Sequence, residues 1–222
     1  MVDPGLELVA CGSSHATMPT FGAWEAEVLG LSLDQVDLVS AHAYYENTGD
    51  LGSFLASSVD MDYMIDSVVA TADATAARLR SGKKVLVSFD EWNVWYQSKL
   101  SESLPTEWTS APRISEEAYT VADAVVVGSL LICLLRHNDR VGAACQAQLV
   151  NAIAPIRAEP TGPAWRQSIF HPFALTSRLA QGEVLHPQLR SPGTARPSTV
   201  RSAPWTRSPP TTPRAAGWRC SW

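Results

Sequence analysis

The sequence predicts an α/β fold built on a parallel sheet, and three observations support that prediction. Strand-like and helix-like segments alternate through about the first 160 residues. Polar side chains follow the end of each expected strand. Hydrophobic residues make up 45% of the 222 residues, which is ordinary for a globular chain with a sizeable core. In such folds helices cover the sheet, and ligands bind where the carboxyl ends of the strands meet.

Four strands are expected in chain order. The segment LELVAC (6–11) is a short β-rich run that ends at Gly12, and VDLVSAH (36–42) is the second strand. The third strand is KVLVSF (84–89). We expect the fourth strand at AQLVNAIAPI (147–156), which stops near two prolines.

Helices are expected between these strands, beginning with residues 20–29. The best-marked helix spans 57–79, where apolar residues recur at spacings of three and four. Ser57 and Asp60 have the spacing of a capping box, and Gly82 is placed for a C-terminal cap. The sequence therefore predicts an amphipathic helix with both ends marked.

A further helix is predicted over 115–137, with Glu116 and Glu117 in its first turn. Its nearly all-round apolar character suits a helix wedged between a sheet and a neighbour. The longest run of small and apolar residues, 124–135, is well short of the roughly 20 residues needed to cross a bilayer. The N-terminal residues lack the basic and apolar regions of a secretory signal, so we predict a cytoplasmic protein with no membrane partner.

No metal or disulfide pattern is evident. The four cysteines are widely spaced and contain no C-x-x-C pair: Cys11, Cys133, Cys145 and Cys220. Three acids in the 57–79 helix could be read as metal ligands: Asp60, Asp62 and Asp66. Acids in a first turn are explained more simply by the helix dipole, so we predict no metal and no cofactor.

Composition changes after about residue 187. Residues 188–222 hold six arginines, no lysine and no acid, with many Pro, Ser and Thr residues and no apolar period. We predict that 187–222 is disordered, and we interpret it as G- and C-rich codons translated in a shifted frame. A nucleic-acid-binding tail is the weaker alternative, because the arginines are dispersed singly and the net charge is −5. The chain therefore divides into 1–186 and 187–222, and no nucleic-acid partner is expected.

Polar and aromatic residues at the strand ends predict a shared pocket. The candidates are Ser13, Ser14, His15, His42, Tyr44, Tyr45, Asp90, Glu91, Trp92, Asn93, Trp95, Gln148 and Asn151. Carboxylates among Tyr and Trp rings suit a sugar, whose apolar faces stack on rings while its hydroxyls bond to polar groups.

Plainer alternatives stay open for these residues. Asp90 and Glu91 point to opposite sides of a regular strand, so at most one should face the pocket, the other bonding to backbone or an arginine. Two solvated loop acids, a core histidine at position 42 and ordinary packing of the rings are the alternatives. Metal-assisted hydrolysis lacks an H-x-H or H-x-x-x-H pair, and a serine nucleophile lacks the G-x-S-x-G elbow.

Many segments, in one order, resemble the retaining α-L-arabinofuranosidases of glycoside hydrolase family 51. They are ELVACGSS, MPTFGAWE, VDLVSAHAYYEN, FLASSVDMD, SFDEWNVWYQ, YTVADAVVVGSLLICLLRH, AQLVNAIAPI and GPAWRQSIFHPFALTSR, which cover roughly residues 2–186. The family catalytic domain is a (β/α)8 TIM barrel followed by a β-sandwich. The resemblance implies that 1–186 is a partial (β/α)8 barrel, about the last four βα units.

The resemblance also implies roles for particular residues. Glu91, in the DEWN motif, corresponds to the nucleophile, and His42 and Tyr44 to residues that orient the nucleophile and the sugar. Trp95 corresponds to a residue of the substrate pocket, and Gln148 to a sugar-contacting glutamine. The family's acid/base is a glutamate in an Asn-Glu pair, and this sequence contains no such pair.

These points predict a fragment of an enzyme that hydrolyses terminal non-reducing α-L-arabinofuranosyl residues of arabinan or arabinoxylan oligosaccharides. We expect the chain to be inactive alone, because it lacks the acid/base. A non-catalytic arabinose-binding remnant is the alternative. Members of the family commonly form homo-oligomers, which we do not expect of half a barrel.

Overall fold

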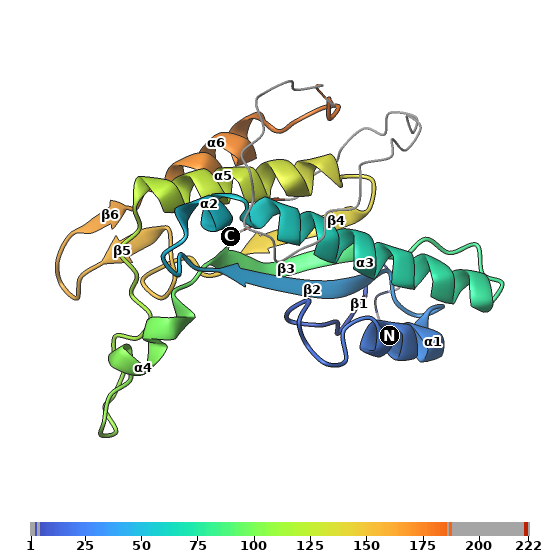
Figure 1. Cartoon of the computed structure of the whole chain (residues 1–222), viewed down its shortest axis with the longest axis horizontal. Helices are drawn as coiled ribbons and strands as arrows, with labels where there is room; N and C mark the ends of the chain where they lie inside the picture. The colour runs from blue at the N-terminus through green and yellow to red at the C-terminus, as the bar shows by residue number, and fades with distance from the viewer. Residues whose placement is uncertain (1–2, 4, 186, 188–219, 222) are drawn as a thin grey trace.

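The structure is a computed structural model that describes residues 3, 5–185, 187 and 220–221. Its main sheet is parallel, with the strand order β1-β2-β3-β4-β7 (Figure 1). The strands are β1 Val9–Ala10, β2 Leu38–Tyr45, β3 Leu86–Val94, β4 Val141–Gln146 and β7 Cys220–Ser221. The predicted α/β class with a parallel sheet is confirmed.

Helices follow the first four strands of the main sheet and pack against one another in chain order. They are α1 Ala23–Ser32, α2 Leu51–Leu55, α3 Ser57–Arg78, α4 Leu100–Ser103, α5 Val121–Arg136 and α6 Phe170–Leu179, with a 3-10 turn η1 at Gln97–Lys99. Figure 1 shows α3 and α5 side by side above the sheet, with α6 beyond α5. Within the described ranges, no helix combines the length and apolar character that crossing a membrane requires.

The span predicted for the 57–79 helix is confirmed by α3, but both predicted caps are wrong. Ala56 is both the C-cap of α2 and the N-cap of α3, and its backbone is not extended. A capping box needs an extended N-cap residue, so none forms there. The Ser57 hydroxyl instead donates to the carbonyl of Phe54 at 2.6 Å. At the other end, Arg80 takes the left-handed conformation, with a φ of 55°, before the chain reaches Gly82.

The start predicted for the 115–137 helix is also wrong. Helix α5 begins at Val121, after Thr120, whose side chain forms a capping box with Asp123. Ser115 has a φ of 52°, which is incompatible with a helix start. Glu116 is not in a helical first turn but pairs with the Arg157 guanidinium at 3.0 Å.

The fourth strand lies at 141–146 and not at the predicted 147–156. The strand consists of small residues, VGAACQ, which have weak strand preferences of their own. A Cβ at Gly142 would stand 3.0 Å from the side chains of both Leu38 and Leu86, so a larger residue there would require these leucines to shift. Residues 156–158 form β5 (Ile156–Ala158), which pairs antiparallel with β6 (Ala164–Arg166).

The hydrophobic core lies between the sheet and the helices. One face of β1, β2, β3 and β4 supplies it, and the buried stripes of α3 and α5 complete it. The largest buried apolar side chains are Trp92, Phe89, Phe173, Leu29, Met61, Met64, Ile65, Leu130, Leu131, Leu134 and Ile169. Trp92 of β3 stacks on Phe173 of α6 with ring centroids 6.4 Å apart, which fixes β3 beneath that helix.

The predicted disorder and shifted frame of 187–222 fall outside the described residues, apart from residue 187 and β7. Strand β7 extends the sheet beside β4, with Ala144 opposite Cys220 and Cys145 opposite Ser221. The interpretation of this segment therefore stays a prediction.

Candidate functional site

The carboxyl ends of β2 and β3 bring four of the five predicted site residues together. His42 and Tyr44 are the partners of Glu91 and Asn93 in the strand pairing. The Tyr44 hydroxyl donates to Oε2 of Glu91 at 2.8 Å, and Nδ1 of His42 lies 3.7 Å from the same oxygen. The second carboxylate oxygen, Oε1 of Glu91, has no hydrogen-bond partner in the part of the chain that the structure describes.

A bulge in β3 explains how adjacent acids face one histidine. Ser40 pairs with Ser88, but His42 pairs with Glu91, so β3 carries one more residue than β2 over this interval. Both acids therefore contact His42, and the prediction that the second acid would bond to backbone or an arginine is wrong, because Asp90 bonds to His42 and two serine hydroxyls. Nε2 of His42 lies 3.0 Å from Oδ1 of Asp90, while Nδ1 of the same ring faces Glu91.

Asp90 is held by side chains from both strands. The Ser40 hydroxyl donates to Oδ1 of Asp90 at 2.7 Å, and the Ser88 hydroxyl donates to Oδ2 at 3.1 Å. Together with His42 these hydroxyls use both carboxylate oxygens, and Ser40 and Ser88 are themselves buried. Asp90 therefore anchors the imidazole, leaving Glu91 as the acid with a free oxygen.

His42 and Asp90 each favour the charged form of the other. The hydrogen bond to Asp90 raises the pKa of His42 above its usual 6.5, against the opposing effect of burial, and the charge of Glu91 adds to the increase. Burial would raise the pKa of Asp90, but hydrogen bonds from His42, Ser40 and Ser88 outweigh it and hold the pKa below 3.8. The raised pKa widens the pH range over which His42 carries a positive charge beside Glu91.

Two aromatic side chains pack together beside Glu91. Burial, then the hydrogen bond to Glu91, raises the pKa of Tyr44, so its hydroxyl stays protonated and remains a donor. The Trp95 ring packs edge-on against Tyr44, with centroids 5.1 Å apart. Nε1 of Trp95 is buried and has no acceptor among the described residues.

The loop after β4 is tied to β3 by Asn93. The Asn93 amide donates to the backbone carbonyls of Ala147 and Ile153, and its own oxygen accepts from Nε2 of Gln146 at 3.0 Å. Gln148, the fifth predicted site residue, is exposed in this loop. Among the hydrogen bonds of the described residues, none joins Gln148 to Glu91.

The turn after β1 supports the site through hydrogen bonds of its backbone. The buried Glu25 accepts from the backbone N–H groups of Ser13 and Gly22, both at 2.7 Å, and so fixes the turn against α1. A Cβ at Gly12 would lie 1.9 Å from the Ser40 carbonyl oxygen, so only glycine fits there. The carbonyl of Ser13 then accepts from the backbone N–H of His42 at 3.3 Å.

Two features escaped the reasoning from sequence. The serines that anchor Asp90 stand two residues before His42 and Asp90 in VSAH and VSFD, a repeated pattern that could have been noticed. The other is a cluster of Asp62, Cys133 and His137, the one group in the described ranges whose side chains lie as close together as metal ligands do. It lies between α3 and α5, not at the strand ends.

Comparisons with known proteins identify relatives of this chain. A family model described as the α-L-arabinofuranosidase C-terminal domain matches residues 90–211. An intracellular exo-α-(1→5)-L-arabinofuranosidase of Streptomyces lividans is 58% identical over 193 residues, covering 86% of this chain and 29% of the relative. An exo-α-(1→6)-L-arabinofuranosidase of Bifidobacterium longum is 54% identical over 200 residues, covering 86% of this chain and 38% of the relative.

Solved structures agree with these relatives. A family 51 α-L-arabinofuranosidase of Bifidobacterium longum superimposes with a TM-score of 0.71 at 48% identity, over 78% of this chain and 37% of that chain. An arabinose complex of the Thermotoga maritima α-L-arabinofuranosidase gives a TM-score of 0.60 at 25% identity, over 78% of this chain and 31% of that chain. The chain thus spans about three to four tenths of the length of these relatives.

Proposed function

The chain belongs to the α-L-arabinofuranosidases of glycoside hydrolase family 51, and from that premise we propose that it carries the nucleophile side of a retaining α-L-arabinofuranosidase site. The observation that carries this proposal is the different bonding of the two carboxylate oxygens of Glu91. One of its carboxylate oxygens is held by Tyr44 beside His42, while the other is free to attack. A nucleophile needs this combination of fixed orientation and an open lone pair.

In the proposed reaction Oε1 of Glu91 attacks the anomeric carbon of an α-L-arabinofuranoside. A carbon–oxygen bond forms to the carboxylate as the bond to the leaving oxygen breaks, and the leaving group departs with the bonding electrons. Tyr44 and His42 hold Glu91 in one orientation before attack. Trp95 shapes the sugar pocket with its ring and offers Nε1–H to a hydroxyl, and Gln148 is proposed to contact the sugar from the loop after β4.

A second carboxylate is needed to complete the reaction. Retaining glycosidases place an acid/base about 5–5.5 Å from the nucleophile, where it protonates the leaving group and later activates water. Asp90 is unsuited to this role, because His42, Ser40 and Ser88 already bond to it and hold it ionised. The sequence contains no Asn-Glu pair, so we propose that the chain does not turn over substrate unaided.

The fold supports the same proposal. We propose that the first four βα units are half of a (β/α)8 barrel, whose other half would pair with β1. Leu6, Leu8 and Val9, which lie in and before β1, are about half exposed. An apolar, exposed edge of this kind is what a missing neighbour would cover.

The substrate class is proposed from the relatives. The two relatives matched by sequence are named exo-α-L-arabinofuranosidases, so we propose that the site accepts terminal non-reducing α-L-arabinofuranosyl residues of arabinan or arabinoxylan oligosaccharides. Some relatives are named as intracellular, and we propose the same location here. We do not propose that this chain forms the homo-oligomers of the family.

The experiment uses a substrate whose leaving group needs no proton. With 2,4-dinitrophenyl α-L-arabinofuranoside, we expect the purified chain to release up to one equivalent of dinitrophenolate and then stop, because no base activates water. Azide, which needs no base, should restart turnover and give the α-configured arabinofuranosyl azide. Glu91→Gln should abolish the burst, whereas the matched acid variant Glu46→Gln should keep it.

Two outcomes would contradict the proposal. Steady hydrolysis without azide would show that a working acid/base is present, and a burst that survives in Glu91→Gln would show another nucleophile. Binding of arabinose by calorimetry without any burst would favour the arabinose-binding remnant instead.

A further inference from the structure

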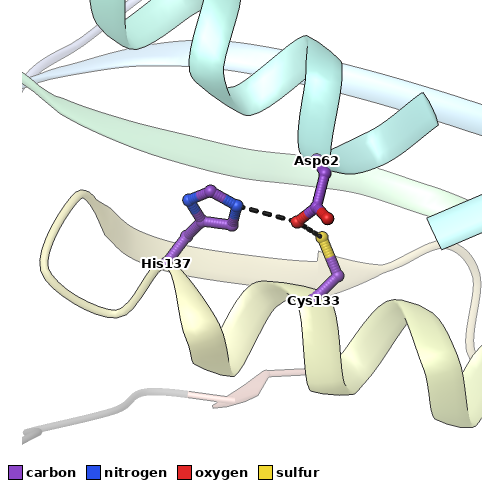
Figure 2. A group of neighbouring side chains, drawn as sticks. All are labelled: Asp62, Cys133 and His137. Carbon is purple, nitrogen blue, oxygen red and sulfur yellow. Dashed lines mark hydrogen bonds and ion pairs between the residues drawn. The ribbon is translucent and has the colours of Figure 1, made fainter. Parts of the chain in front are cut away.

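Three possible metal ligands converge between α3 and α5, away from the strand ends. Oδ1 of Asp62 lies 3.1 Å from Sγ of Cys133 and 2.9 Å from Nε2 of His137. All three atoms lie within 4.8 Å of one another. Figure 2 shows Asp62 reaching from one helix toward both side chains of the other. These contacts are hydrogen bonds, and they bring three donor types that Zn²⁺ accepts to one point.

The helices hold these ligands in register. Cys133 and His137 are four residues apart at the end of α5, so they project from the same face. Asp62 comes from α3, which packs against α5 along this face. Asp62 and Cys133 are buried, while the His137 side chain keeps 18% of its surface exposed. The cluster therefore combines rigid supports with a route from solvent.

The surrounding charges are one cation, Arg136, and one further carboxylate, Asp66. Arg136 pairs with Oδ2 of Asp62 at 3.4 Å and leaves Oδ1 to the cluster. Nδ1 of His137 lies 3.9 Å from the exposed carboxylate of Asp66. A carboxylate facing the second nitrogen of a histidine is the usual support of a metal-bound imidazole. A divalent ion with one thiolate, one carboxylate and one neutral imidazole would be electrically balanced.

We propose that Asp62, Cys133 and His137 form a binding site for a borderline-soft divalent cation, Zn²⁺ above all, with water in the fourth position. Sulfur and imidazole ligands favour Zn²⁺ over Mg²⁺ or Ca²⁺, which prefer oxygen alone. On binding, Cys133 gives its thiol proton to solvent, and His137 carries its proton on Nδ1 toward Asp66. The ion would link α3 to α5 and brace the helices that cover β2 and β3.

The test is a Co²⁺ titration of the metal-stripped 222-residue chain. We expect one equivalent to produce a sulfur-to-cobalt charge-transfer band that Zn²⁺ displaces, and we expect Zn²⁺ to raise the melting temperature. Cys133→Ser should lose the band and the thermal shift. The matched control Cys11→Ser/Cys145→Ser/Cys220→Ser, which keeps Cys133 as its single thiol, should retain both.

The exposed Asp66 gives a variant that should fold normally. Asp66→Asn should keep the band but weaken Zn²⁺ binding about 10- to 100-fold, as the loss of a carboxylate behind a ligating histidine usually does. A folded wild-type chain that produces no band would overturn the proposal, since the cluster would then be a hydrogen-bond network only. So would a band that persists in Cys133→Ser, or one that is lost in the triple control.

Discussion

Replacing Asp90 by asparagine should remove the largest cause of the raised pKa of His42 and should destabilise the fold. The variant keeps the size of the side chain but removes the negative charge that accepts from Ser40, Ser88 and His42. Hydrogen bonds to a charged group contribute about 1.5–3 kcal/mol each, but the asparagine oxygen can still accept from a serine. Because 31% of the Asp90 side chain is exposed, screening reduces the ionic part, and we expect a net loss of about 1–3 kcal/mol of unfolding free energy.

The pH dependence of this loss follows from the directions of the two pKa shifts. His42 has a raised pKa, so its contribution is complete below its usual 6.5 and disappears as the pH rises through the folded-state pKa. Asp90 has a lowered pKa, so its contribution is present above 3.8 and disappears as the pH falls through the folded-state pKa. The stability gap between wild type and Asp90→Asn should therefore be widest between pH 3.8 and 6.5.

Urea unfolding across this pH range measures the gap, and NMR titration of the His42 ring protons measures the pKa directly. In Asp90→Asn the pKa of His42 should fall, because the largest cause of its increase is gone while burial still opposes the charge. Ser88→Ala is the matched control: it removes one donor to Asp90, costs about 1 kcal/mol and leaves the charge in place. An unchanged His42 pKa in Asp90→Asn would refute the reasoning.

Three further predictions concern the site and its support. Tyr44→Phe should slow the dinitrophenolate burst roughly 10- to 100-fold, as expected for a lost bond to charged Glu91, and stopped-flow absorbance measures it; an unaltered burst rate would argue against orientation by the hydroxyl. Gly12→Ala should cost more than about 2 kcal/mol in urea unfolding, because its Cβ would overlap a carbonyl of β2, whereas Gly82→Ala, with open space around it, should be within about 1 kcal/mol of wild type. Thr120→Ala should lower the unfolding free energy by about 0.5–2 kcal/mol through the lost cap of α5, and no loss would show that the cap is dispensable.

The sequence predicted the fold class because period and composition carry it. Short apolar runs mark β2 and β3, and the spacing of three and four marks α3, so these elements lie close to where they were expected. Strand β4 was missed because its residues are small and include Gly142, which lies close to the side chains of Leu38 and Leu86 on neighbouring strands. Packing between distant strands leaves no local signal in a segment of this kind.

The site, like the fold, could be predicted only in part. The strand-end rule located His42, Tyr44, Glu91 and Trp95, and the structure brings them together. The position of Asp90 could not be predicted, because a bulge depends on how two strands pair and not on either strand alone. The contacts among Asp62, Cys133 and His137 arise only from the packing of α3 on α5 across about 70 residues of sequence.

Peptide mapping of the chain after the dinitrophenyl arabinofuranoside burst tests the central claim most directly. If Glu91 is the nucleophile and no base releases the sugar, one arabinofuranosyl group should remain bound, and tandem mass spectrometry should place it on Glu91. A sugar found on Asp90 or any other side chain, or a chain recovered without label after a full burst, would contradict the account.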